Sequence, residues 1–268
     1  MKPFLKWAGG KLRLVARIKT MLPAGKRLIE PFVGSGALFL NTDFDEYILA
    51  DANGDLINLY QQVQVGGEPF IDYCRSLFTE GNNTAAAFYA CRQRFNETVD
   101  PLEKAALFVY LNKHCYNGLC RYNSKGDYNV PFGRYKQPYF PAEEMRYFQH
   151  KAQNAHFLVQ DFGVTMTTAA PGDVLYCDPP YAPLSATANF TSYSEKSFGP
   201  AEQRRLAELA GQLRQRGIPV VISNHDTAFT REIYRTADAH DYFGVQRHIS
   251  CDGANRTKAA EVLALYGG

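Results

Sequence analysis

The sequence of 268 residues lacks the patterns typical of membrane, secreted and zinc-binding proteins. Its longest apolar run, Ala105 to Leu111, is far shorter than the ~18 residues that a membrane-spanning helix needs. The N-terminal stretch MKPFLKWAGGK has no uninterrupted apolar core of a signal peptide. None of the six cysteines belongs to a C-x-x-C pair, and no Cys/His cluster has zinc-site spacing. We therefore expect a cytoplasmic protein with reduced thiols, no bound metal and no membrane association.

A strong overall charge is also missing, because the formal net charge is only +2 at pH 7. So weak a field cannot hold nucleic acid, and any basic binding surface has to be local. One segment qualifies, with a net charge of +4 over 24 residues, from Lys113, Arg121, Lys125, Arg134 and Lys136 against Asp127. Tyrosine and phenylalanine rings are interleaved with these charges. This basic segment is a candidate nucleic-acid surface, and a solvated positive face is the alternative.

The content of 46% hydrophobic and 21% charged residues indicates a packed globular core. Strands are expected at Arg27 to Phe32, Tyr47 to Ala50, Asp173 to Cys177 and Ile218 to Ser223, with a final pair near Val245 to Ile249 and Glu261 to Tyr266. Between about Pro69 and Phe140 this β-α alternation disappears and helical patterns dominate. The sequence therefore predicts an α/β domain interrupted by a mostly helical insertion.

Helix signals support this division. An N-cap at Asp100 with a proline at the first helical position precedes the buried-type run Ala105 to Leu111. Further helices are expected from the apolar spacing of Leu56, Leu59, Tyr60 and Val63, from Leu206 to a stop at Gly217, and around Thr230 to Ala237. Ser124 to Asp127 lies between short aromatic stretches and reads as a hairpin turn within the insertion.

A glycine-rich turn, Pro31-Phe-Val-Gly34-Ser-Gly36, sits where a first strand would feed a first helix. Glycines there let the backbone approach a ligand closely. Asp51 lies 15 residues after Gly36 at the end of the next strand, where an acid accepts hydrogen bonds from ribose hydroxyls. Phe39 occupies the third glycine position of a dinucleotide fingerprint, which disfavours pyrophosphate. A nucleoside without phosphates is the expected ligand, and a structural β-α turn is the alternative.

The stretch LYCDPPYA joins an apolar strand to Asp178, two prolines and Tyr181. Consecutive prolines fix φ and remove two amide donors, so the strand has to end there. What remains is a stiff corner that presents the Asp178 carboxylate and one aromatic ring. Near the N-terminus, the run Trp7-Ala-Gly-Gly-Lys11 offers a cation for a carboxylate, and a surface turn is its alternative.

Together FLKWAGGK, EPFVGSG, LAD and DPPY resemble the N6-adenine DNA methyltransferases of the Dam type. The resemblance runs nearly end to end and includes YNGLCRYN, VPFGRYKQPYF, APLSATANFTSY and SNHDT. It implies a Rossmann-like class I methyltransferase domain (residues 1–54 and 142–268) with an inserted, mostly helical target-recognition domain (55–141) carrying a β-hairpin. It also implies the cofactor S-adenosyl-L-methionine, the product S-adenosyl-L-homocysteine, and the palindrome GATC in double-stranded DNA as the target. A bacterial, nucleoid-associated protein that is monomeric in solution fits this interpretation.

The resemblance gives the corner a chemical role. The amino group of adenine is a poor nucleophile, because its lone pair is delocalised into the ring. Asp178 and the Pro179 carbonyl can accept hydrogen bonds from its two N–H groups, and both hydrogen bonds strengthen in the transition state. The rigid Pro180 keeps these groups in place, and Tyr181 offers a stacking face for a base flipped out of the duplex. No metal is required by this chemistry.

Other roles follow from the resemblance alone. The implied cofactor residues are Trp7, Lys11, Gly34, Gly36, Asp51 and Asp178. Arg121 and Arg134 can read guanine in the major groove, Asn117 and Leu119 resemble base-edge readers, and Tyr135 contacts a base or a phosphate. Lys6, Lys113, Lys125 and Lys136 are assigned to phosphates. In the loop after DPPY, Phe190 and Tyr193 are candidate contacts to the base, and His225 is expected to be a hydrogen-bonded histidine near a strand end.

Two alternatives remain open. Protein-glutamine and RNA methyltransferases share the pocket but typically carry Asn first in the tetrapeptide, where this chain has Asp178. A DNA-binding module that has lost catalysis is the second, although the intact DPPY and glycine turn argue against it.

Overall fold

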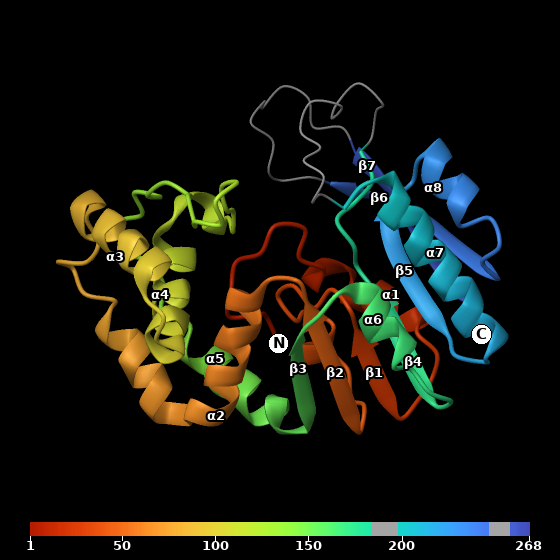
Figure 1. Cartoon of the computed structure of the whole chain (residues 1–268), viewed down its shortest axis with the longest axis horizontal. Helices are drawn as coiled ribbons and strands as arrows, with labels where there is room; N and C mark the ends of the chain where they lie inside the picture. Colours follow the sequence, from red (N-terminus) through yellow and green to blue (C-terminus); the bar gives the residue numbers. More distant parts are fainter. Residues whose placement is uncertain (184–197, 247–257) are drawn as a thin grey trace. The chain divides into compact units, whose positions relative to one another are not determined.

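A computed structural model describes residues 1–183, 198–246 and 258–268 (Figure 1). These residues form seven strands in one sheet of order β3-β2-β1-β4-β5-β7-β6. The strands are β1 (Arg27–Glu30), β2 (Glu46–Asp51), β3 (Ala155–Val159), β4 (Asp173–Cys177), β5 (Val220–His225), β6 (Ala239–Gln246) and β7 (Lys258–Tyr266). Strand β4 pairs in parallel with β1 and β5, whereas β7 pairs antiparallel with β5 and β6. The predicted mixed α/β class is confirmed.

The chain folds as two compact units, which are described separately below. The first unit comprises Met1–Val15, Val33–Asp43 and Leu49–Val159, and the second comprises Ala16–Phe32, Phe44–Ile48 and Gln160–Gly268. The first unit holds the glycine turn from Val33 onward and the basic segment, and the second holds the corner formed by Asp178 to Tyr181. The expected boundaries of the inserted domain, at residues 54/55 and 141/142, remain a prediction.

Helices dominate the first unit, and they are α2 (Gly54–Ser76), α3 (Ala85–Glu97), α4 (Pro101–His114) and α5 (Ala142–Lys151). Asp100 caps α4 by accepting from the Leu102 amide at 3.0 Å, as the sequence predicted. Every residue of α4 from Ala105 to His114 is buried, so the prediction of a buried helix is confirmed. The 3-10 turn η3 (Tyr116–Gly118) follows closely and lies within the basic segment, which begins at Lys113 in α4.

In the second unit, α6 (Phe162–Thr167), α7 (Pro200–Gln215) and α8 (Ala228–Ile233) accompany the strands, together with α1 (Val15–Met21), which begins at the unit boundary. Leu206 and Leu213 of α7 are buried in one apolar cluster with β4 and β5 residues such as Leu175 and Ile222. Gly217 follows α7 with a left-handed φ of +71°, and the predicted helix stop is confirmed.

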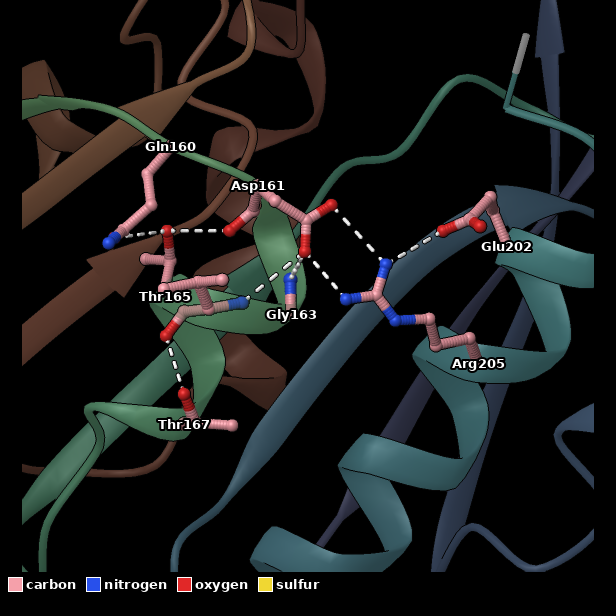
Figure 2. A network of polar contacts seen from close by, with 8 residues as sticks. Gln160, Asp161, Gly163, Thr165, Thr167, Glu202 and Arg205 are labelled. Atoms are coloured by element: carbon pink, nitrogen blue, oxygen red, sulfur yellow. Dashed lines mark hydrogen bonds and ion pairs between the residues drawn. The ribbon is translucent and has the colours of Figure 1, made fainter. Parts of the chain in front are cut away.

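A polar network links α6 to α7 in the second unit (Figure 2). Asp161 caps α6 by accepting from the Gly163 amide at 3.0 Å, and its carboxylate forms an ion pair with Arg205 at 2.6 Å. Glu202 contacts the same guanidinium from the other side at 3.0 Å. A Cβ atom at Gly163 would lie 2.2 Å from Arg205 Nη2, so a side chain there would displace this guanidinium.

Several predicted elements differ from the structure. The apolar stretch after the glycine turn forms only the 3-10 turn η2 (Phe39–Asn41), not a first α-helix. Helix α8 begins at Ala228 and ends at Ile233, earlier than expected, because Thr227 forms a capping box with Thr230. The predicted hairpin contains a turn at residues 124–126, but its strands reduce to the isolated bridges Cys115↔Phe132 and Tyr122↔Tyr128.

The final strand pair is longer than predicted. Strand β6 begins at Ala239 rather than near Val245, and β7 begins at Lys258. The expected end of the first strand, Ile249, lies outside the described residues. No helix in residues 1–183, 198–246 and 258–268 is long and apolar enough to cross a membrane.

Candidate functional site

The glycine turn of the first unit is held against the end of β2. Gly34 and Gly36 have left-handed φ values of +46° and +69°, where side chains are strained. The Gly34 amide donates to Asp51 Oδ2 at 3.1 Å, and the Gly34 carbonyl accepts from the Tyr60 hydroxyl at 2.5 Å. A Cβ atom at Gly34 would lie 3.0 Å from Trp7 Nε1. The structure thus brings together Trp7, Gly34 and Asp51, three of the predicted cofactor residues.

Asp51 is a partly buried acceptor at the last position of β2. Its Oδ1 accepts from the Asn53 amide at 2.9 Å, and Oδ2 accepts from Gly34. Burial raises the pKa of Asp51 above its ordinary value of 3.8. A carboxylate has about four acceptor positions, so two backbone donors leave capacity for a ligand hydroxyl.

The segment after Trp7 forms a compact turn. The Gly10 amide donates to the Trp7 carbonyl at 3.2 Å, and Gly9 has a φ of +74°. Lys11 is only 8% exposed, and its ammonium donates to the Gly9 carbonyl at 2.6 Å. Its predicted contact with a cofactor carboxylate remains a prediction.

An open depression of about 480 Å³ lies beside Asp51 in the first unit. Its lining residues are Asp51, Ala52, Asn53, Gly54, Asp55 and Tyr122. The Tyr122 hydroxyl, from the basic segment, donates to Asp55 Oδ2 at 2.8 Å. The volume lies within the range of small-molecule sites. The sequence did not single out Tyr122 or Asp55, because their contact joins residues 67 positions apart.

In the second unit, Asp178 directly follows β4 and is oriented by β5. The Ser223 hydroxyl donates to Asp178 Oδ1 at 2.8 Å. Tyr176 in turn donates its hydroxyl to Ser223 Oγ at 3.1 Å. Ser223 and Tyr176 are 1% and 2% exposed, so this chain of hydroxyls is shielded from water. The chain of hydrogen bonds therefore limits the orientations open to the Asp178 carboxylate.

Two amides and a histidine hold the proline corner. Gln203 of α7 donates to the Pro180 carbonyl at 2.7 Å. Asn224 donates to Gln203 Oε1 and accepts from the Ala182 amide, each at 2.9 Å. His225 Nδ1 lies 2.6 Å from the Ala182 carbonyl oxygen. The prediction that His225 is hydrogen-bonded near a strand end is confirmed, and its partner is the corner itself.

The Tyr181 ring is fixed at two points. Its centroid lies 4.7 Å from that of His225 in an edge arrangement, and its hydroxyl donates to Glu261 Oε2 at 3.2 Å. A ring held in this way loses little freedom on stacking with a planar ligand. The next residues of the predicted loop, including Phe190 and Tyr193, lie outside the described residues.

Ser223→Ala should lower kcat by roughly tenfold, because the hydrogen bond that orients the Asp178 carboxylate is lost. The measurement is kcat under saturating substrate. Thr167→Val is the control, because in the described part of the chain the Thr167 hydroxyl bonds a carbonyl of its own helix at 2.7 Å (Figure 2). An unchanged kcat for Ser223→Ala would show that Ser223 does not position Asp178 for catalysis.

Lys6, Asn117 and Tyr135 are connected in the first unit and are called the reading cluster below. The Lys6 ammonium lies 4.2 Å from the centroid of the Tyr135 ring. The Tyr135 hydroxyl accepts from the Asn117 amide at 3.0 Å. Lys6 and Asn117 are exposed and Tyr135 is half-buried. Three predicted DNA-binding residues therefore lie together.

The other predicted readers lie along the same segment. Arg121 is exposed, and its guanidinium donates to Asn129 Oδ1 at 2.7 Å. Leu119 is half-buried, and its carbonyl accepts from the Tyr128 hydroxyl at 2.9 Å. Arg134 is exposed with a left-handed φ of +55°, and within the described part of the chain it has no hydrogen-bonded partner.

The lysines assigned to phosphates differ in environment. Lys125 and Lys136 are exposed, whereas Lys113 is only 7% exposed on α4. Burial, reinforced by the charge of Lys6, lowers the pKa of Lys113 to about 8. Within residues 1–183, 198–246 and 258–268, no group of His, Cys, Asp or Glu is arranged to hold a metal ion. Cys251 lies outside this part, and the five cysteines inside it are free.

Comparison with known proteins identifies the family. Residues 7–247 match the D12 class N6 adenine-specific DNA methyltransferases. The chain is 54% identical over 266 residues to the DNA adenine methylase of Serratia marcescens, covering 99% of this chain and 98% of that protein. It is 53% identical over 265 residues to the DNA adenine methylase of Escherichia coli (strain K12), covering 99% and 95%. For the DNA adenine methylase of Haemophilus influenzae, the identity is 51% over 269 residues, covering 99% and 94%.

The chain therefore belongs to the D12 class of N6 adenine-specific DNA methyltransferases. The predicted activity, methylation of adenine N6 in DNA, is confirmed at this level. The alternatives of a protein-glutamine or RNA methyltransferase do not fit this membership.

Proposed function

We propose that this enzyme transfers a methyl group from S-adenosyl-L-methionine to adenine N6 within GATC in double-stranded DNA, after flipping the base. The observation that carries the proposal is the fixed acidic corner, in which Ser223 orients Asp178 and Gln203 holds the Pro180 carbonyl. Because β5 and α7 hold this corner, its hydrogen-bond acceptors keep one geometry. Acceptors fixed in advance are what stabilise the positive charge that develops in the transition state.

Asp178 and the Pro179 carbonyl accept hydrogen bonds from the two amino N–H groups of the flipped adenine. Each hydrogen bond strengthens as positive charge grows on the nitrogen, so the pair stabilises the transition state more than the bound base. The amino proton that becomes acidic on methylation leaves toward the Asp178 carboxylate. Tyr181, held by His225 and Glu261, stacks on the base and contributes about 1–3 kcal/mol.

The first unit fits the nucleoside part of the cofactor. Asp51 is partly buried, borders a depression of about 480 Å³ and retains acceptor capacity for ribose hydroxyls. The Gly34 turn leaves no room for a side chain beside the Trp7 ring. When bound, S-adenosyl-L-methionine supplies a methyl group on a sulfonium, and the protein's part is to hold and orient the reacting groups. Lys11 is assigned to the cofactor carboxylate.

Recognition is assigned to residues 55–141 together with Lys6. Asn117, Leu119, Arg121 and Arg134 contact base edges, and Tyr135 contacts a base or a phosphate. Lys6 and the lysines of the basic segment contact phosphates. The Arg121 guanidinium, already fixed by Asn129, loses little freedom on binding guanine. We assign the enzyme to the bacterial cytoplasm, acting as a monomer on each strand of its palindrome in turn.

A methyl-transfer assay tests the target. Purified protein is incubated with labelled S-adenosyl-L-methionine and with duplexes that contain GATC or a scrambled site of equal composition. Transfer to the GATC duplex should exceed transfer to the scrambled duplex by roughly 10³-fold or more, with N6-methyladenine as the product. Equal transfer to both duplexes would remove the specificity claim while leaving the family activity intact.

A further inference from the structure

Asn112, a buried polar residue in the last turn of α4, makes three hydrogen bonds to backbone outside its own helix. Its Oδ1 accepts from the Lys6 amide at 2.9 Å. Its Nδ2 donates to the Lys6 carbonyl at 2.8 Å and to the Gly118 carbonyl at 3.2 Å. Asn112 is 2% exposed. One side chain thus joins two segments that are more than 100 residues apart in the chain.

These two segments touch directly at Gly118. A Cβ atom at Gly118 would lie 2.3 Å from Lys6 Cβ and 2.6 Å from Lys6 Cδ. The φ of Gly118 is +64°, so its backbone also favours glycine. The Lys6 side chain is therefore packed on the Gly118 backbone, and the buried Asn112 bonds the backbone of both residues and fixes their relative position.

Both segments carry members of the reading cluster. Lys6 belongs to one segment, and Asn117, next to Gly118, belongs to the other. Tyr135 closes the arrangement, because its ring lies under the Lys6 ammonium and its hydroxyl accepts from the Asn117 amide. Asn112 is buried, but two of its bonds hold the backbone of the exposed Lys6, and the third holds the backbone of the buried Gly118 next to the exposed Asn117.

A buried polar side chain can also be present only to satisfy backbone groups of its own helix. His114, two residues along, illustrates that role, because its ring nitrogen bonds the carbonyl of Tyr110 in its own helix at 2.8 Å. The partners of Asn112 are different, since none belongs to α4. The hydrogen bonds of Asn112 therefore hold the segments around Lys6 and Gly118 together, and they do not cap the end of α4.

We propose that Asn112 is a specificity-determining positioning residue that locks Lys6 and Asn117 into one DNA-reading unit. The inference rests on the proposed function, in which Asn117 contacts a base edge and Lys6 contacts a phosphate that fixes the register of the protein on the DNA. When the Asn112 side-chain amide is removed, Lys6 and Asn117 can move independently of each other. The enzyme's contacts to GATC and to an altered site then become more nearly equal in strength. The consequence is lower discrimination between sites, rather than a uniform loss of binding.

The experiment measures kcat/KM on duplexes with GATC and with each single-base change in that site. The variants are Asn112→Leu, which is similar in size and removes all three bonds, and Asn112→Asp, which turns two donated bonds into repulsion between oxygens. The matched control is Gln64→Leu. Gln64 also donates from a partly buried amide to two carbonyls of a distant segment, at 2.6 and 2.9 Å, but it lies outside the reading cluster.

Both Asn112 variants should lower the ratio of kcat/KM on GATC to that on altered sites by about tenfold or more, since a base-pair difference is read through a few such contacts. Gln64→Leu should leave this ratio unchanged even where its Tm falls by a similar amount. A ratio within twofold of the unmodified enzyme for Asn112→Leu would overturn the inference, as would an equal fall for Gln64→Leu.

Gly118→Ala provides a route that keeps the Asn112 side chain, in case the Asn112 variants do not fold. Its methyl group displaces Lys6 directly and should lower the same ratio, and an unchanged ratio would count against the proposal. If the unmodified enzyme shows no preference for GATC, the proposed target fails first, so the two failures are distinguishable.

Discussion

Asp178→Ala should reduce kcat by roughly 10³-fold, the loss typical of removing one group that stabilises developing charge. The substituted corner still ends β4 and keeps the Gln203 bond to the Pro180 carbonyl, so the protein should fold. In the proposed mechanism, adenine then retains the Pro179 carbonyl as one of the two acceptors that localise its lone pair. Single-turnover methyl transfer with prebound cofactor measures the chemical step directly.

The control for Asp178 is Glu232→Gln, which removes an exposed carboxylate of α8 in the same unit. Cofactor binding, followed by calorimetry, should persist in Asp178→Ala while the methyl-transfer rate collapses. Near-normal turnover by Asp178→Ala would exclude the carboxylate from the mechanism.

Asp51→Ala should weaken cofactor binding by about 10- to 100-fold, the equivalent of one or two hydrogen bonds to a charged group. The substitution removes the proposed acceptor for ribose and leaves the amides of Gly34 and Asn53 without this partner. Titration of S-adenosyl-L-homocysteine by calorimetry gives the dissociation constant. Asp43→Asn is the matched control, because Asp43 is an exposed acid of the same unit.

The pH dependence of cofactor binding tests the same residue. Burial raises the pKa of Asp51 above 3.8, so its carboxylate takes up a proton at a higher pH than an exposed aspartate does. Because the ionised form is the better acceptor, cofactor affinity should be complete above this raised pKa and fall as the pH decreases through it. Asp51→Asn should have a flatter profile, and equally steep profiles would assign the effect to another group.

The local motifs were readable from the sequence because neighbouring residues build them. The glycine turn needs Gly34 in a left-handed conformation, and DPPY needs two adjacent prolines, so short windows contain the physical constraint. The N-cap at Asp100 and the helix stop at Gly217 were predictable for the same reason.

What the sequence could not show are the contacts between distant segments. Ser223 reaches Asp178 across 45 positions, and Asn112 reaches Lys6 across 106. No periodicity encodes such pairs, although SNHDT resembled the family as strongly as DPPY did. The short η2 turn was mistaken for a helix because four apolar residues do not distinguish a helical turn from a buried loop.

The bond from Ser223 to Asp178 makes the enzyme sensitive to how its sheet assembles. Strands β4 and β5 pair with Cys177 opposite Ile222, which places Ser223 one position beyond. Side chains alternate between the two faces of a strand, so a slip of one residue would put an aliphatic or an amide group where the hydroxyl belongs. A molecule that folded with that error would retain part of its hydrophobic packing, yet its Asp178 carboxylate would lack the Ser223 hydroxyl that orients it. With the proposed role of Asp178, efficient methylation therefore requires a molecule in which β4 and β5 are paired in the correct register.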